Sequence, residues 1–180
     1  SAQGDRVIAV DLLVNDQDGL GAWKFYEHSF IPVQAEFDHL PVMDRFADAV
    51  IFNASFHYSE NYAGTLKEAL RVLSPQGLVV IMDSPVYRRS ASGEKMVQER
   101  EEQFRHKYGF ASNNLQSENY LTYARLKELA QELNLKWKFI TPFYGLRWML
   151  NPLMAKVLGR REPARFHLLV ARKNSKSSQN

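Results

Sequence analysis

Polar side chains that can move protons or bind a small ligand follow two short apolar runs in the middle of the chain. They belong to Asn53, Ser55, His57 and Tyr58 after residues 49–52, and to Asp83 and Ser84 after residues 78–82. An imidazole or a phenol can act as a general base or acid, so His57 and Tyr58 are the candidate catalytic residues. Asp83 and Tyr87 are further candidate bases. The competing interpretation of His57 is a structural residue at the entry of a helix.

A carboxylate also ends an earlier apolar run, in the sequence RVIAVD over residues 6–11. At the tip of a parallel strand, such a carboxylate can accept hydrogen bonds from the two hydroxyls of a ribose. Asp11 is therefore a candidate ribose ligand. The alternative is an aspartate that ends the strand and caps a turn.

Acidic and aromatic residues follow a third short run, residues 33–36. A carboxylate here can accept from the exocyclic amine of an adenine, and an aromatic ring can cover the base. Glu36 and Phe37 are the candidates for these two roles. The alternative is a polar loop with one buried phenylalanine.

These residues need a sheet whose strands end at one edge. Between the two central runs, Leu66, Ala69, Leu70 and Leu73 recur at helical spacing, which predicts an amphipathic helix over 62–73. A strand, a helix and a parallel strand follow from this pattern. Ligands of open parallel sheets bind outside the carboxyl ends of the strands. The unit thus forms part of a sheet core and one wall of a cleft.

The rest of the chain adds the helices and strands that complete such a domain. We expect helices over 22–29 and 93–108 and a helix capped by Thr122, and strands over 135–141 and 166–171. The stretch 142–165 mixes aromatic and apolar residues with arginines. It is expected to cover the sheet edge; a wall for a bulky substrate or a membrane-surface contact is the alternative.

The composition is typical of a globular domain, and the charged residues are unevenly distributed along the chain. The chain has 180 residues, 45% of them apolar, and contains no cysteine. This excludes disulfides and thiolate metal sites and favours a cytoplasmic protein. Of 23 basic and 20 acidic residues, ten basic and one acidic lie from Asn134 onward. Because no nucleic-acid motif accompanies this basic end, we interpret it as a solvated edge.

Several motifs in order resemble those of the class I S-adenosylmethionine-dependent methyltransferases, type 11 in particular. The matching segments are AVD at 9–11, EFDHLP at 36–41, RFADAVIFNASFHY at 45–58 and EALRVLSPQGLVVIMD at 68–83. The resemblance implies an α/β fold, with a Rossmann-like, doubly wound, mostly parallel sheet and an antiparallel last strand. It also implies S-adenosylmethionine as cofactor.

Carried onto this chain, the resemblance assigns five cofactor-binding residues. Asp11 would bind the ribose, Glu36 and Phe37 the adenine, and Asn53 and Ala54 the methionine moiety. The side chains of Ser55, His57 and Tyr58 would face the methyl acceptor.

One departure from the family pattern affects the cofactor site. The first strand of the family fold and the glycine-rich loop after it should precede Arg6, and they have no counterpart here. We expect a fragment of a longer protein, a gap filled by another chain, or a sheet that has closed up. Without the strand, two strand edges would be unpaired.

The predicted function is methyl transfer to an unidentified small-molecule acceptor. We expect one domain over 1–173, followed by a disordered tail over 174–180. The alternative is a non-catalytic, methyltransferase-like interaction module. No metal site is expected, because the five histidines are scattered. Neither nucleic acid nor integral membrane contact is expected, and a homodimer is a possible assembly. A nicotinamide-dependent reductase ranks low, because no tyrosine–lysine pair is placed near the cleft.

Overall fold

The computed structural model describes residues 4–27, 30–112, 116–143, 145, 154–155 and 158–174. The strands are β1 (Ile8–Asp11), β2 (Ile31–Gln34), β3 (Ala47–Asn53), β4 (Leu73–Met82), β5 (Pro85–Tyr87), β6 (Leu121–Thr122), β7 (Leu135–Ile140), β8 (Arg165–Phe166) and β9 (Leu168–Lys173). The α-helices are α1 (Tyr62–Val72), α2 (Ser90–Tyr108) and α3 (Tyr123–Glu132), and the 3-10 turns are η1 (Leu20–Phe25) and η2 (Phe56–Tyr58).

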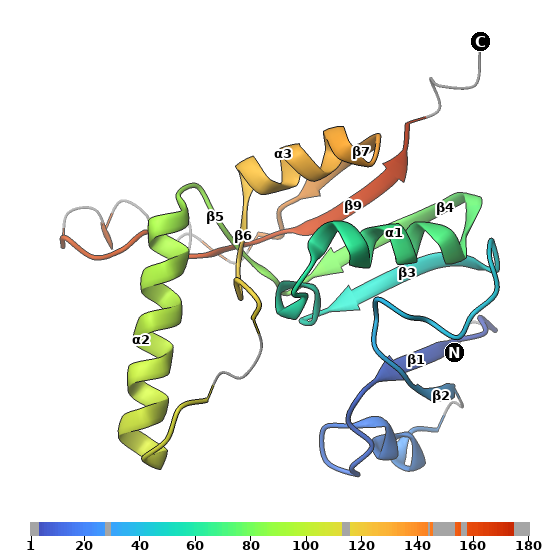
Figure 1. Ribbon diagram of the computed structural model, residues 1–180, viewed down its shortest axis with the longest axis horizontal. Helices are drawn as coiled ribbons and strands as arrows, with labels where there is room; N and C mark the ends of the chain where they lie inside the picture. Colours follow the sequence, from blue (N-terminus) through green and yellow to red (C-terminus); the bar gives the residue numbers. More distant parts are fainter. Residues whose placement is uncertain are drawn as a thin grey trace.

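A four-stranded sheet in the order β3-β4-β9-β7 forms the centre of the fold (Figure 1). Strands β3 and β4 are parallel, with Val50 opposite Val79 and Phe52 opposite Ile81. Strand β9 is antiparallel to both of its neighbours. The predicted strand–helix–strand unit and the antiparallel last strand are therefore confirmed.

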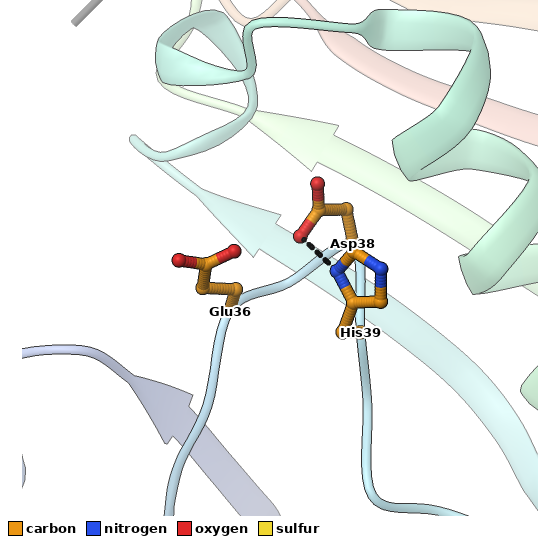
Figure 2. Close-up of side chains that lie close together, drawn as sticks. All are labelled: Glu36, Asp38 and His39. Carbon is orange, nitrogen blue, oxygen red and sulfur yellow. Dashed lines mark hydrogen bonds and ion pairs between the residues drawn. The ribbon is translucent and has the colours of Figure 1, made fainter.

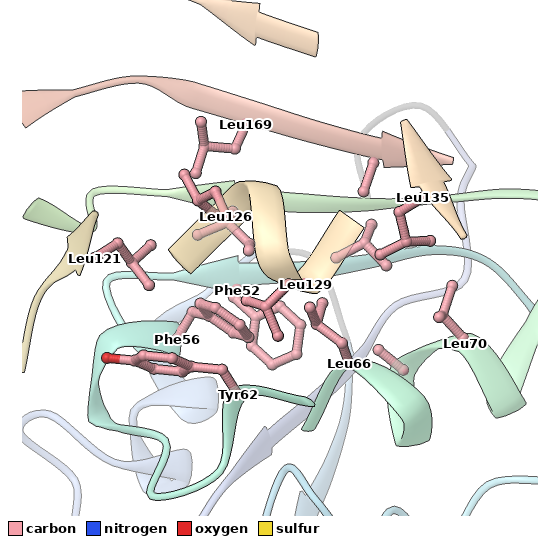
Figure 3. Close-up of a cluster of buried hydrophobic side chains, with 14 of the residues drawn as sticks. Phe52, Phe56, Tyr62, Leu66, Leu70, Leu121, Leu126, Leu129, Leu135 and Leu169 are labelled. Atoms are coloured by element: carbon pink, nitrogen blue, oxygen red, sulfur yellow. The ribbon is translucent and has the colours of Figure 1, made fainter. Parts of the chain in front are cut away.

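The core lies between this sheet and the helices α1 and α3 (Figure 3). The stripe predicted for α1 is buried, and Leu66 and Ala69 are fully inaccessible. The side chain of Asn61 begins the helix by accepting a hydrogen bond from the Gly64 N–H, at 3.0 Å, and the Thr122 hydroxyl caps α3 in the same way. These caps satisfy backbone donors that the first turn leaves unpaired.

Strands β1 and β2 form a separate parallel pair, which shares no strand pairing with β3 in the described part of the chain. The expectation that the sheet might have closed up is therefore wrong. Strand β3 is an edge strand, as predicted, and Ile51 on it is 60% exposed. An exposed isoleucine at a sheet edge is unusual because edges are normally covered or charged.

The sequence did not predict a second small sheet, in the order β6-β5-β8. Its strands have two or three residues each, too few for a periodic pattern. Helix α2 begins at Ser90, three residues before the predicted start, and extends away from the central sheet (Figure 1). The predicted helix over 22–29 is a 3-10 turn instead, over Leu20–Phe25.

Two further sequence predictions fall largely outside the described residues: most of 142–165, with its proposed covering role, and the tail from residue 175 onward. Asn174 itself is held, because its N–H donates to the Asn134 carbonyl at 2.9 Å. In the regions that the structure describes, no helix combines the length and apolar character needed to cross a lipid bilayer.

Candidate functional site

The carboxyl ends of β3 and β4 each turn sharply. Ala54 and Asp83, the residues that follow these strands, both have left-handed backbones, with φ of 51° and 52°. The Ala54 N–H donates to the Met82 carbonyl at 3.1 Å, which joins the two turns. A non-glycine residue in this region is strained, and such strain is concentrated at functional sites. The turns direct η2 and β5 away from the sheet and leave polar groups at its edge.

His57 lies inside this edge, with 7% of its surface exposed. Its Nδ1 is 3.1 Å from the Ser84 hydroxyl, so residues after β3 and β4 meet here. Burial, followed by the nearby positive charge of Arg100, lowers the pKa of His57 to about 4. The imidazole is therefore neutral at neutral pH and can accept a proton, although its base strength is low.

A cavity of about 440 Å³ lies beside His57. Its volume is in the range typical of small-molecule sites. The lining residues come from η2, the turn after β4, β5, α2, the segment before β6 and the chain around β8. They are His57, Asp83, Pro85, Tyr87, Met96, Arg100, Asn119, Arg161, Pro163, Ala164 and Phe166.

Three of the four candidate bases line this cavity: His57, Asp83 and Tyr87. The Tyr87 ring is buried, and its hydroxyl accepts from the Arg161 guanidinium at 3.4 Å. Burial is the main cause that raises the pKa of Tyr87, so its phenol keeps its proton at neutral pH. Tyr58 does not line the cavity; it is 39% exposed and its ring lies against that of His57, with centroids 4.2 Å apart.

The arginines of the cavity were not found by sequence reasoning. Arg161 is paired with Glu99 at 2.6 Å, and Arg100 donates to the Asn119 side-chain oxygen at 2.7 Å. Helix α2 has the composition of a charged surface helix, and no local signal marks which of its arginines turns inward. The small sheet that brings these residues together also has no local sequence signature.

The candidate ribose and adenine ligands lie at the ends of β1 and β2. Asp11 is opposite Gln34 in the parallel register, which places Asp11 and Glu36 at the same end of this pair. Both carboxylates are exposed. One oxygen of Asp11 accepts from the Leu13 N–H at 2.9 Å. Asp11 therefore caps a turn, as the alternative interpretation held, while its carboxylate remains accessible to a ligand.

Phe37 connects the β1–β2 pair to the main core. Its ring packs edge to face against Phe52 of β3, with centroids 6.1 Å apart. It is half-buried, so part of the ring surface stays open. Asn53 and Ala54 are exposed at the end of the same strand β3. Through Phe37, the structure thus joins the loop with Glu36 to the strand that ends in Asn53.

Glu36 also belongs to an acidic cluster with Asp38 and His39 (Figure 2). Possible ligand atoms of the three side chains lie within 4.8 Å of one another, and His39 Nδ1 is 3.0 Å from an Asp38 oxygen. This grouping was not predicted from the sequence, because it joins a histidine to carboxylates and not to another histidine. The His39 side chain is 84% exposed. Exposed acidic groups often gather without a metal, and this geometry alone does not assign one.

The comparisons with known proteins agree with this geometry. Residues 1–81 match the family described as a methyltransferase domain. No curated protein matches the chain significantly. Among solved structures, a Bacillus halodurans C-125 protein assigned as a methyltransferase is 17% identical with a TM-score of 0.62, covering 95% of this chain and 84% of its own.

Two other solved structures have the same fold. A Haloferax volcanii protein, in complex with the Trm112 methyltransferase activator, is 17% identical with a TM-score of 0.63, covering 97% of this chain and 74% of its own. LepI, in complex with S-adenosylmethionine, is 13% identical with a TM-score of 0.54, covering 95% of this chain and 37% of its own.

The matched segment and the fold indicate the class. Residues 1–81 match the methyltransferase-domain family, and solved methyltransferase structures share the fold of the chain. The resemblance, the Rossmann-like fold and the enzyme class predicted from the sequence are confirmed. The cofactor of this class is S-adenosylmethionine, as predicted.

Proposed function

We propose that the protein transfers the methyl group of S-adenosylmethionine to a small molecule bound in the cavity beside His57. The observation that carries this proposal is the position of the cavity. It adjoins the carboxyl ends of β3 and β4, where open α/β sheets bind their ligands. Its volume of about 440 Å³ suits a small molecule better than a macromolecular segment.

The residues at the neighbouring strand ends fit the cofactor in chemistry. Asp11 and Glu36 offer exposed carboxylates for hydroxyl and amine donors, and Phe37 offers a partly open ring for a base. We therefore assign the ribose to Asp11, the adenine to Glu36 and Phe37, and the methionine moiety to Asn53 and Ala54. When bound, the cofactor supplies an electrophilic methyl group, and the chain has to align the acceptor with it.

The cavity residues position the acceptor and handle its proton. Neutral His57 can accept a proton from an acceptor hydroxyl or amine as the new bond forms, while the Ser84 hydroxyl at Nδ1 holds the ring. The protonated phenol of Tyr87 is a hydrogen-bond donor. The apolar side chains of Pro85, Met96 and Phe166 give the acceptor a wall to pack against.

Calorimetry with S-adenosylhomocysteine tests the cofactor assignment. We expect saturable binding, and a loss of at least tenfold in affinity for Asp11→Ala, because a carboxylate that accepts from ribose hydroxyls contributes about 1.5–3 kcal/mol. Asp18→Ala, which removes an exposed carboxylate from the next loop, is the matched control and should bind normally. Unchanged affinity of Asp11→Ala would refute the ribose assignment. A chain that binds no S-adenosylhomocysteine would refute the cofactor assignment for residues 1–180.

A further inference from the structure

We infer that the acceptor carries an anionic oxygen group, a carboxylate or a phosphate, which is bound by Arg100, and an apolar body that fills the rest of the cavity. This inference rests on the proposed function, since it describes the molecule that the cavity receives.

Arg100 is held in place by a buried residue. Its guanidinium donates to the Oδ1 of Asn119 at 2.7 Å, and Asn119 is fully inaccessible to solvent. The Asn119 amide is itself oriented, because its Nδ2 donates to the Ser117 carbonyl at 2.8 Å. A buried amide therefore fixes one edge of the guanidinium against the cavity wall. A guanidinium has five N–H donors, so donors remain for a ligand.

Arg100 also differs in its partners from three of the other half-buried arginines, although among the described residues half-buried Arg165 has no ion pair either. Arg71, Arg125 and Arg161 each form an ion pair with a carboxylate. In the parts of the chain that the structure describes, Arg100 forms none. A partly desolvated guanidinium without a carboxylate partner is costly. An anionic ligand in the cavity would supply the missing charge, with the two-pronged geometry that guanidinium offers to carboxylate and phosphate.

The other charged residues that line the cavity, Arg161 and Asp83, do not neutralise Arg100. Glu99 neutralises Arg161 at 2.6 Å. Asp83 also lines the cavity, but it is exposed, where solvent screens its charge. The positive charge of Arg100 lies close enough to His57 to contribute to its lowered pKa.

The remaining walls are apolar. Pro85, Met96, Pro163, Ala164 and Phe166 line the cavity together with the Tyr87 ring. Such walls favour an aliphatic or aromatic body over a sugar or a peptide. The competing view is that Arg100 only ties α2 to the segment around Asn119, in which case ligand charge would be irrelevant.

Titration with three probes that share a phenyl ring separates these views: benzoate, phenyl phosphate and the neutral benzamide, which has the shape of benzoate. Each titration is followed by NMR of the protein without cofactor. We expect at least one anion to bind at least tenfold more tightly than benzamide, and the stronger of the two identifies the anionic group. Arg100→Gln should abolish the difference. Arg105→Gln is the matched control, since Arg105 lies on the same helix with 63% of its side chain exposed.

Equal affinities for all three probes, or an anion preference that survives in Arg100→Gln, would overturn the inference. If Arg100→Gln does not fold, the pKa of His57 in the wild-type protein, measured with and without the bound anion, tests the inference instead. An anion paired with Arg100 should raise the pKa of His57, while the same concentration of chloride should not. Because cofactor is absent throughout, these results are independent of S-adenosylhomocysteine binding. Failure of the methyltransferase proposal and failure of the anion site are thus distinguishable.

Discussion

His57 should make the folding stability depend on pH in a defined window. The folded protein holds the pKa of His57 at about 4, against 6.5 for the free side chain. Between these values the unfolded chain binds a proton that the folded chain does not. The free energy of unfolding therefore falls as the pH drops from 6.5 towards 4. Above pH 7 both states are neutral and this contribution is constant.

The size of the effect follows from the shift. One pKa unit corresponds to about 1.4 kcal/mol, so the full shift corresponds to about 3 kcal/mol. Since His57 borders a cavity that water can enter, screening lowers the expected loss to about 2 kcal/mol. Replacement by glutamine removes the titration and keeps a side chain that can hydrogen-bond to Ser84. His57→Gln should thus lose about 2 kcal/mol less than wild type between pH 7 and pH 4.

Urea unfolding followed by circular dichroism at pH 7, 6, 5 and 4 measures this difference. His106→Gln is the control, because His106 lies exposed on α2 and its replacement should leave the pH dependence unchanged. NMR titration of the His57 ring gives the pKa directly. A ring that titrates near its usual value would refute the burial argument. So would equal pH dependence of wild type and His57→Gln.

Two further predictions concern packing. Leu66→Ala should lower the free energy of unfolding by about 3 kcal/mol, because Leu66 is fully buried under the sheet. Leu12 is exposed, so Leu12→Ala should change this free energy by less than about 0.5 kcal/mol. Similar losses for both variants in urea titrations would contradict the core described above. Gly93→Ala should destabilise by about 1–3 kcal/mol although alanine favours helices, because a Cβ at Gly93 would collide with the Tyr120 ring. A raised unfolding temperature for Gly93→Ala would show that this contact is absent.

The predictable part of the fold is the part with local patterns. The α1 stripe repeats at helical spacing, and its cap Asn61 immediately precedes the helix. Strands β3 and β4 are continuous apolar runs that pair in parallel. For these elements, residue propensity, hydrophobic pattern and packing agree, which is why they can be predicted from the sequence alone.

The cavity lacked such signals. Strands β5 and β6 contribute two or three residues each, and their pairing depends on residues more than thirty positions apart. Ala54 and Asp83 adopt left-handed backbones without being glycines, so the turns that open the site cannot be recognised from residue type. Arg100 is one of two arginines on α2, and the contact with the buried Asn119 distinguishes it from Arg105.

The pKa of His57 also limits the acceptors that it can serve. A conjugate acid with a pKa of about 4 releases its proton easily, so the neutral ring cannot ionise a weakly acidic hydroxyl before the methyl group moves. It can take the proton only as the bond forms and the acceptor atom becomes strongly acidic. An anion beside Arg100 would oppose the charge that helps to lower this pKa, and would make the imidazole a stronger base. Acceptor binding and proton removal would then be linked through one guanidinium, so that an acceptor without the anionic group would meet a weaker base as well as a weaker site.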